Sequence, residues 1–513
     1  MKLIAFATRM LVFTVIAAGI MTLASPLSPA AAAKQVPRAV SIARTVVIPD
    51  CTLFVDAAFN GTGEGSVTRP FKTISAAVGA AANGAVICVA QGVYAESLVP
   101  GLKYFSLAGG FQRGKSFKVR NSATFVTKAV GQGGSFIRIV DPGPSGNQLT
   151  AIDGFDISGY SQAIYRDIYY SQRFDLTNNF IHDNVCANAG LAGAGFALNN
   201  VSGVIKGNVF ARNRCGRGDA GFLNDSTNEN RVTIARNRVE SNAGDEPQSS
   251  HGGGLYLFTN RITLTGNMFL NNRVTGWGAG LYVGAFTAGG QPTTARLGWN
   301  IYRGNRAGIA GGGFFCDDGA ACLSEHEIYD SNCGGNILLD SGPDDSGPTI
   351  ARFDHLTVYN AKSVECDAPG LGVQIDKGNT APDSYSFVNA IFWGNAPNGD
   401  LVSTCSTGCG TLSVSINYSI IRRPKANGGA AIVFGGGNLA PVNPGFVSVA
   451  KGDFHLKSIR GHWTAAGYVE DTVSSPALAK GDPNAAVPDN PPRAGNRTEL
   501  GAYGNSAEAS YVR

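Results

Sequence analysis

The chain has 513 residues, 15% of them charged, with 68 glycines and a formal net charge of +4. A charge so close to balance gives no support to a nucleic-acid-binding protein or to one with a strongly acidic partner. The length would allow several ordinary domains, but the abundance of glycine and the lack of long helical patterns favour one elongated repeat domain.

The N-terminus has the three parts of a secretory signal peptide. MKLIAFATRM carries positive charges, LVFTVIAAGIMTLA is apolar, and SPLSPAAAA supplies small residues for cleavage near Ala33. An uncleaved membrane anchor is the alternative, but the apolar run is short for a span and no later stretch is long and apolar enough. We therefore expect a signal peptide at 1–33, a flexible segment at 34–50, and an exported protein without a transmembrane segment after cleavage. Its location would be extracellular, periplasmic or at the cell surface.

Residues 51–96 begin the part that is predicted to fold. A strand leads into a glycine-rich loop, then into the amphipathic segment PFKTISAAVGAAA and the strand AVICVA. Phe71, Ile74 and Val78 share one helical face, and Pro70 stands at its start, a position that proline favours. We predict a short helical cap before the first coil of the repeat region.

Six similar units follow one another between residues 179 and 332. Their closing asparagines are 29, 29, 30, 33 and 27 residues apart, and an apolar residue stands three positions before each one. Self-similarity at this period is typical of stacked-repeat proteins. The asparagine pairs are Asn179 and Asn184, Asn208 and Asn213, Asn237 and Asn242, Asn267 and Asn272, and Asn300 and Asn305, while the sixth unit keeps only Asn332. The apolar residues are Ile181, Phe210, Val239, Phe269, Tyr302 and Tyr329.

Short β-rich runs bounded by glycine, such as GLYLFTN and GGFFCDD, lie between the asparagine pairs. Several runs alternate apolar and polar residues as strands do, and no unit has room for two helices. The pattern predicts an all-β, right-handed parallel β-helix over residues 51–440, with one apolar side chain per coil stacked inside. The asparagine amides both donate and accept, so they would bond the turns and their copies one coil away as ladders.

The ten cysteines are an even number, which in an exported chain predicts disulfides. Cys186 and Cys215 each lie two residues after a ladder asparagine, so stacking would bring their Cα atoms within disulfide range. We predict that this pair is bonded. The sequence leaves the remaining connectivity open, and the further pairs that it favours are Cys51 with Cys88, Cys316 with Cys322, Cys333 with Cys366, and Cys405 with Cys409.

Several motifs outside the repeats bear on the family. Near the N-terminus these are the predicted cap, SLAGGF and AIDGFDIS, and near the C-terminus NAIFWGN, NPGFVSVAKGDFHLKS, SSPALAKGDP and NRTELGAYGNSAEAS. Together they resemble the ends of exported bacterial β-helix proteins of the pectate-lyase-like superfamily, which implies an irregular closing segment over residues 441–513. The usual Ala-Gly-Asp after the SPA-type motif is interrupted here by Lys480. The resemblance implies the architecture but leaves the activity open, because this superfamily includes lyases, hydrolases, esterases, tailspikes and adhesins.

Arginines recur on the predicted turns and offer one kind of site. Arg214, Arg273 and Arg306 each follow a ladder asparagine directly, and Arg238 is close in register. Stacked arginines can hold the carboxylates of an acidic polysaccharide, and in a lyase one neutralises the uronate while a base removes the neighbouring proton. We take Arg273 and Arg306 as catalytic candidates and Arg214 and Arg238 as substrate-binding ones. The alternative is a solvated basic edge.

Two acidic loops, CDDGAAC and LDSGPDDSGP, offer a second kind of site. Asp317 and Asp340 share an offset from the start of their strands, so we predict that they stack on adjacent coils. Such a cluster would supply hard oxygen ligands for calcium, or paired carboxylates for glycoside hydrolysis. The alternative is a loop made of turn-forming residues. The candidate calcium ligands are Asp317, Asp318, Asp340, Asp344 and Asp345.

His251 and Trp277 offer a third kind of site. His251 lies in a glycine-flanked loop beside Asp245 and Glu246, and Trp277 follows one coil later. A catalytic histidine beside an aromatic platform would suit a sugar, whereas the alternative is an isolated surface histidine.

No set of catalytic motifs is complete in this chain. The ordered N-T-D, D-D, G-H-G and R-I-K set typical of polygalacturonases, a serine nucleophile elbow and zinc-spaced cysteines are all missing. We therefore expect a secreted monomer that interacts with a polysaccharide or cell-surface glycan, as a lyase on acidic glycans rather than a glycoside hydrolase. The alternative is a non-catalytic, adhesin-like protein that uses the stack for rigid display.

Overall fold

A computed structural model describes residues 49–512, apart from 102, 141–145, 169, 189, 226–229, 245–250, 260, 286–292, 318, 343–346, 363–369, 396–398 and 423. The chain divides into two units, Met1–Val46 and Val47–Arg513. The first unit, which contains the predicted signal peptide, lies outside the described residues. No helix among the described residues is long and apolar enough to cross a membrane.

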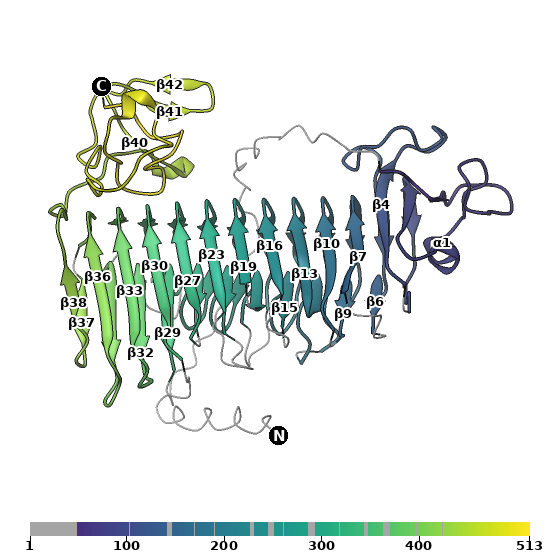
Figure 1. Ribbon diagram of the computed structural model, residues 1–513, viewed down its shortest axis with the longest axis horizontal. Coiled ribbons are helices and arrows are strands. Elements are labelled where there is room, and N and C mark those ends of the chain that lie inside the picture. The colour runs from purple at the N-terminus through teal and green to yellow at the C-terminus, as the bar shows by residue number, and fades with distance from the viewer. Residues whose placement is uncertain are drawn as a thin grey trace, which may run out of the picture. The chain divides into compact units, whose positions relative to one another are not determined.

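The second unit is an all-β, right-handed parallel β-helix, as the sequence predicts. Three long parallel sheets, here called A, B and C, run along it (Figure 1). Between Phe105 and Cys405 each coil of chain contributes one strand to each sheet in the order A, B, C, whereas the coils at the two ends are incomplete. Sheet A contains β1 (Leu53–Val55), β2 (Ala85–Ala90), β4 (Phe105–Phe111), β7 (Gly146–Asp153), β10 (Gln172–Thr177), β13 (Val201–Lys206), β16 (Arg231–Ala235), β19 (Arg261–Thr265), β23 (Thr294–Gly298), β27 (Ala321–Glu325), β30 (Ile350–Asp354), β33 (Asp383–Val388), β36 (Leu412–Asn417) and β38 (Ile432–Phe434).

The other two sheets are shorter in their strands but equally regular. Sheet B contains β3 (Gly92–Tyr94), β5 (Thr127–Val130), β8 (Phe155–Ser158), β11 (Phe180–His182), β14 (Val209–Ala211), β17 (Arg238–Glu240), β20 (Met268–Leu270), β24 (Ile301–Arg303), β28 (Ile328–Asp330), β31 (Thr357–Tyr359) and β34 (Ile391–Trp393). Sheet C contains β6 (Ile137–Ile139), β9 (Ile164–Arg166), β12 (Phe196–Asn199), β15 (Gly221–Asn224), β18 (Leu255–Phe258), β22 (Leu281–Val283), β26 (Phe314–Cys316), β29 (Ile337–Ser341), β32 (Val373–Lys377), β35 (Leu401–Cys405) and β37 (Lys425–Asn427). A small pair, β21 (Arg273–Val274) and β25 (Arg306–Ala307), lies between sheets B and C in the chain.

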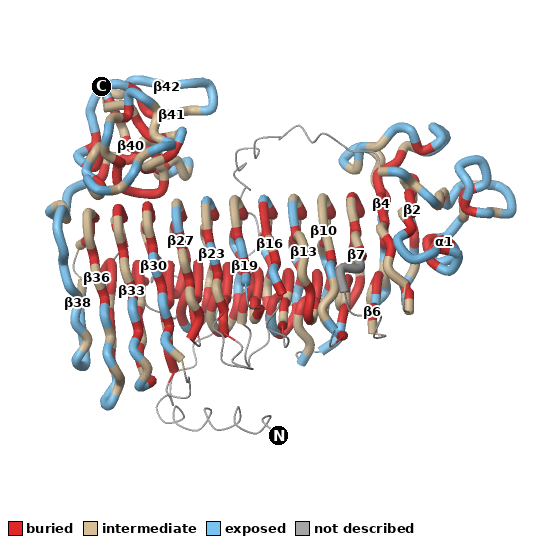
Figure 2. Tube along the Cα trace, viewed as in Figure 1, coloured by how far each residue is buried: buried red, intermediate tan, exposed pale blue. Residues whose placement is uncertain are grey.

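One continuous core fills the interior of the coils, and the alternation of each strand determines which side chains enter it. The apolar residue of each repeat pairs with its copy on the next coil, from Ile181 with Phe210 to Tyr302 with Tyr329. These side chains are all buried, so the predicted interior stack is confirmed. Figure 2 shows the buried positions alternating with exposed ones along the strands of sheet A.

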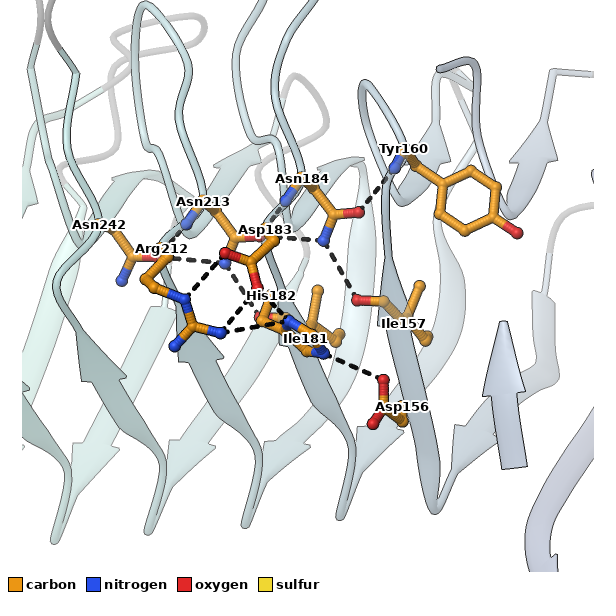
Figure 3. A network of polar contacts seen from close by, with 10 residues as sticks. All are labelled: Asp156, Ile157, Tyr160, Ile181, His182, Asp183, Asn184, Arg212, Asn213 and Asn242. Carbon is orange, nitrogen blue, oxygen red and sulfur yellow. Dashed lines mark hydrogen bonds and ion pairs between the residues drawn. The ribbon is translucent and has the colours of Figure 1, made fainter. Parts of the chain in front are cut away.

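The two asparagine ladders are also confirmed. At the turn from sheet B toward sheet C, the Nδ2 of Asn184 donates to the Oδ1 of Asn213 at 2.9 Å, and the Nδ2 of Asn213 donates to the Oδ1 of Asn242 at 3.1 Å (Figure 3). Each amide also donates to a main-chain carbonyl of the preceding coil, as Asn213 does to Ile181 at 3.0 Å. The ladder therefore satisfies the buried polar groups of the turns.

The first ladder, at the turn from sheet A to sheet B, ends differently from the second. There the Nδ2 of Asn300 donates to the Oε1 of Glu327 at 2.8 Å, because the sixth unit has a glutamate where the others have asparagine. Glu327 is fully buried, and the Oη of Tyr329 donates to its other oxygen at 3.4 Å. Burial raises the pKa of Glu327 to about 8, against the hydrogen bonds from Asn300.

The predicted disulfides form wherever both cysteines are described. Cys186 and Cys215 are bonded with their Cα atoms 4.9 Å apart, which confirms the register of the repeats. Cys51 with Cys88, Cys316 with Cys322, and Cys405 with Cys409 are bonded as well. Cys333 is disulfide-bonded, and its predicted partner Cys366 lies outside the described residues. Disulfides are typical of proteins that meet an oxidising compartment.

The N-terminal cap contains the predicted helix, but the helix begins later than expected. Helix α1 runs over Ile74–Ala80 with Thr73 as its N-cap. The carboxylate of Glu96 accepts from the main-chain N–H groups of Ile74 and Ser75 at 2.8 and 2.7 Å, which satisfies two donors of the first turn. Phe71 is therefore not on the helical face with Ile74 and Val78, and instead forms a β-bridge with Val55.

The C-terminal closing segment contains the antiparallel pairs β39 (Phe446–Ser448) with β40 (Asp453–Leu456) and β41 (His462–Thr464) with β42 (Gly467–Val469). It also contains the 3₁₀ helices η2 (Val449–Lys451) and η3 (Pro492–Ala494). Its apolar side chains pack against Ile328 and Ile391 on the outer face of sheet B. The N–H of Ala502 donates to the Oγ1 of Thr357 at 3.0 Å, so this segment is attached to the last third of the stack.

Candidate functional site

The outer face of sheet C carries a row of aromatic rings. In β18, Leu255 and Leu257 belong to the interior core, whereas Tyr256 belongs to a second apolar cluster on the opposite face. The register places Tyr256 beside Tyr282 and Tyr282 beside Phe315 on the next coils. Their ring centroids are 4.6 and 4.7 Å apart, which makes a continuous edge-to-face stack along the solenoid.

The turn that enters sheet C packs closely against this row. His251, Trp277 and Ala310 follow one another as β-bridge partners on successive coils, as the repeat register predicts for His251 and Trp277. The two rings have centroids 5.0 Å apart. At Gly252 the backbone has φ of +63°, and an added Cβ would lie 2.7 Å from the Cβ of Tyr256. Only glycine at this position therefore lets the turn lie so close to the aromatic row.

The rings of this site divide into a floor and a rim. Tyr256, Tyr282 and Phe315 are buried, whereas Trp277 and His251 are only half-buried. Half-buried rings suit the apolar faces of sugars. Asp245 and Glu246, expected beside His251, lie outside the described residues.

A second column on the same face contains three aspartates. The register pairs Cys316 with Leu339, so Asp317 and Asp340, which follow directly, are neighbours on adjacent coils as predicted. Asp340 in turn pairs with Asp376 on β32. Sequence reasoning missed Asp376, although the alignment of VQIDK with ILLDS, two strands of the same pattern, contains the signal.

The three aspartates have different environments. The Oη of Tyr282 donates to Asp317, which is buried and thereby tied to the aromatic row. Asp376 is half-buried, and the Nε2 of Gln374 donates to its Oδ2 at 2.5 Å. Burial raises the pKa of Asp376, and the hydrogen bond from Gln374 opposes this effect. A carboxyl with a raised pKa therefore stands beside a second carboxyl.

The positions of the described aspartates do not test the hypothesis that the protein binds calcium. Asp318, Asp344 and Asp345 lie outside the described residues, and no group of three or more histidine, cysteine, aspartate or glutamate side chains with metal-binding geometry occurs within the described ones. Calcium therefore stays a prediction from the sequence.

The arginines predicted as one group lie on separate surfaces. Arg273 and Arg306 are partners in β21 and β25, so these two stack directly, and neither has an ion pair with a described residue. Arg214 lies in the same column, but Ala243 separates it from Arg273. Arg238 lies on sheet B, where it forms an ion pair with Glu240 at 2.5 Å.

The outer face of sheet B holds a charged network that sequence reasoning also missed. His182 lies between Asp156, 3.0 Å from its Nε2, and Asp183, 2.5 Å from its Nδ1, and Arg212 donates to Asp183 at 2.7 Å (Figure 3). Burial disfavours protonation of His182, but the two carboxylates outweigh it and raise the pKa. The hydrogen bonds from Arg212 lower the pKa of Asp183 to about 2. These charges are mutually satisfied, so the network has the features of a structural site.

No protein-family model, curated protein or solved structure matches the chain.

Proposed function

We propose that the protein interacts with a polysaccharide along the outer face of sheet C and hydrolyses it with Asp340 and Asp376. The observation that supports this proposal is the register pair Asp340–Asp376, which lies on the same outer face as the aromatic row, two residues further along the strands. Neighbouring strands are about 4.8 Å apart. Carboxyl groups separated by about 5–5.5 Å are typical of retaining glycosidases.

The environment of each carboxyl suggests its role. Asp376, with its raised pKa, protonates the glycosidic oxygen as the bond from that oxygen to the anomeric carbon breaks. The carboxylate of Asp340 bonds to the anomeric carbon, and water then displaces it while Asp376 accepts the proton from that water. The half-buried ring of Trp277 would hold a neighbouring sugar by stacking.

A lyase on acidic glycans is the second candidate. It is favoured by the stacked pair Arg273 and Arg306, whose charges are available to a uronate carboxylate. Both candidates place the protein outside the cell and within the pectate-lyase-like superfamily. That placement is supported by the β-helix and by the disulfides.

The test is to incubate the purified protein with acidic and neutral polysaccharides, with and without calcium, and to weigh the products by mass spectrometry. Fragments heavier by one water are expected, and Asp340→Asn and Asp376→Asn should each lower the rate at least 100-fold. Asp167→Asn serves as the matched control, since Asp167 accepts from Asn199 at 2.7 Å at the other end of sheet C. Unsaturated fragments would establish the lyase instead. An unchanged panel would favour the non-catalytic, adhesin-like alternative.

A further inference from the structure

The outer face of sheet A carries mainly polar side chains over the strands β13, β16, β19 and β23. Alternate residues of these strands enter the core, and the residues between them point outward. The outward positions include four cations and no acidic residue. The outward positions are Ser202, Val204, Lys206, Arg231, Thr233, Ala235, Arg261, Thr263, Thr265, Thr294, Arg296 and Gly298.

The cations lie close enough together to act on one ligand. Arg231 and Arg261 are register partners on adjacent strands, about 4.8 Å apart. Arg296 lies on the next strand, paired with Thr263, and Lys206 lies on the strand before Arg231. All four are exposed (Figure 2 shows this face).

These charges are not neutralised within the described residues. No ion pair involves Lys206, Arg231, Arg261 or Arg296 there, in contrast to Arg173 on the neighbouring β10, which pairs with Asp175 at 2.8 Å. Unpaired like charges at this spacing repel one another, so an anionic ligand would relieve the repulsion. The threonine hydroxyls between the arginines add further hydrogen-bond donors.

An exposed tryptophan lies at the edge of the same face. Trp299, in the turn after β23, is 40% exposed, and one of its faces stacks on His326 with ring centroids 4.2 Å apart. The equivalent turn position one coil earlier is Gly266, and two coils earlier it is Arg236. Among the described residues, only the Cγ of Arg236 comes within 4 Å of a Cβ placed at Gly266. The missing side chain leaves the second face of Trp299 open.

The open position has the width of a sugar ring. Arg236 and Trp299 are two strand spacings apart, roughly 9.6 Å, and the glycine between them contributes only backbone. A pyranose there would stack on the indole of Trp299 and place its carboxylate toward Arg236 or Arg296.

We propose that the outer face of sheet A is a second binding surface, which holds a uronic-acid polysaccharide through Lys206, Arg231, Arg261 and Arg296 and stacks one of its sugars on Trp299. This surface is separate from the aspartates of sheet C and does not depend on their chemistry. A polymer with its charges on sugar rings fits because the surface combines cations with an aromatic platform. The repeat of strand positions along the face suits an extended chain.

The test measures the affinity of the Asp376→Asn protein, in which the proposed hydrolysis is blocked, for three probes at several salt concentrations. The probes are polygalacturonate, polyphosphate, which is anionic but has no sugar ring, and neutral dextran. We expect polygalacturonate to bind with an affinity that falls as salt rises, and dextran not to bind. The triple variant R231Q/R261Q/R296Q should bind polygalacturonate at least tenfold more weakly.

The matched control is K72Q/K115Q/K118Q, which removes the same charge from exposed lysines near the N-terminal cap. It should change the affinity for polygalacturonate less than twofold. An equal loss of affinity in both triple variants would overturn the proposal that the outer face of sheet A binds the polymer. Trp299→Ala should weaken binding of polygalacturonate at least fivefold and leave polyphosphate binding unchanged. An equal effect on both probes would overturn the sugar-stacking part. Far-UV circular dichroism and the thermal midpoint confirm that each variant is folded.

Discussion

The two asparagine ladders use the same side chain for the same task, yet they reach a carboxyl by different routes. The ladder between sheets A and B meets Glu327 directly, where the Nδ2 of Asn300 donates to its Oε1 at 2.8 Å. The ladder between sheets B and C runs on from Asn332 through Asn336 and Asn395, and the Nδ2 of Asn395 donates to the Oδ1 of Asp400 at 3.0 Å. The comparison teaches that a ladder is held by hydrogen bonds along its length, and that its response to pH depends on the surroundings of the carboxyl at its end.

The largest effect should come from breaking either ladder in its middle. Asn242→Leu removes the acceptor of the Asn213 N–H and Nδ2, bonded at 2.9 and 3.1 Å, and the donor to the carbonyl of Phe210 at 3.1 Å. Each buried group left unpaired costs about 1–3 kcal/mol, so we expect a loss of roughly 4 kcal/mol or more in the free energy of unfolding. Asn237→Leu should cost the same in the other ladder.

Urea titrations followed by circular dichroism check both variants. The half-buried Asn199 provides the control, since Asn199→Leu removes only the hydrogen bond from its side chain to Asp167 and should cost less than about 1 kcal/mol. If one ladder variant were much less costly than the other, the two ladders would not be equivalent along their length.

The next effect concerns the end of the first ladder. The native pKa of Glu327 is raised to about 8, so the folded protein holds a proton that the unfolded chain releases near its ordinary value. Stability from this group is present at low pH and is lost as pH rises from about 4.5 to about 8, by on the order of 4 kcal/mol. Burial also raises the pKa of Glu499 to about 8, so this carboxyl adds a similar loss. Glu327→Gln should remove only the loss that is due to Glu327, so its urea midpoint should fall less between pH 5 and pH 9 than that of the wild-type protein.

Asn332→Asp sharpens the comparison by placing a carboxyl in the second ladder. This variant should lose more stability with rising pH than the wild-type protein does. An equal pH effect in Glu327→Gln and in the wild-type protein would show that the pKa of Glu327 is not raised in the folded state.

A smaller effect on stability should come from removing the disulfide between Cys186 and Cys215, which links two coils beside the second ladder. Cys186 and Cys215 lie two residues beyond Asn184 and Asn213, and the bond closes a loop with a sequence separation of 29. Replacing both with alanine should lower the free energy of unfolding by about 3–4 kcal/mol, chiefly by freeing the unfolded chain. Thermal unfolding at matched pH measures it, and a change under about 1 kcal/mol would show that the ladder holds these coils without the clamp.

The smallest effect should arise outside the second ladder, at His182. Its pKa is raised in the folded state, so protonated His182 stabilises the protein fully below its unfolded pKa, and this contribution is lost as pH rises through the folded value. Because Asp183 and Arg212 are about half-exposed, the contribution should be under about 1 kcal/mol. Nuclear magnetic resonance titration of His182 should give a pKa above 6.5, and Arg212→Gln should raise it further.

The repeats allowed most of the fold to be predicted because their spacing is visible in the chain. Asn184, Asn213 and Asn242 recur at a nearly constant period, and the disulfide from Cys186 follows from that register. The start of α1 could not be predicted in the same way, because Glu96, which caps it, lies in a different element.

The candidate sites were predicted less completely, for a physical reason. Asp376 lies in a coil without an asparagine pair, so no repeat aligned it with Asp340. The arginines of sheet A occupy strand positions, whereas the repeated arginines that are visible in the sequence follow the ladder asparagines in the turns. Whether Arg261 faces outward depends on the alternation of its strand, and whether it is paired depends on neighbours that are 30 or more residues away.

The attachment of the closing segment has a consequence for how the chain is made. His326 bonds to the carbonyl of Ala502 across 176 residues, and Thr357 bonds to Ala502 across 145. Synthesis at roughly 5–20 residues per second leaves the apolar side chains of β28 and β34 bare for many seconds after their coils have emerged. The nascent solenoid therefore exposes apolar surface until the closing segment packs against sheet B. A chain truncated before this segment would keep that surface exposed and be prone to aggregate.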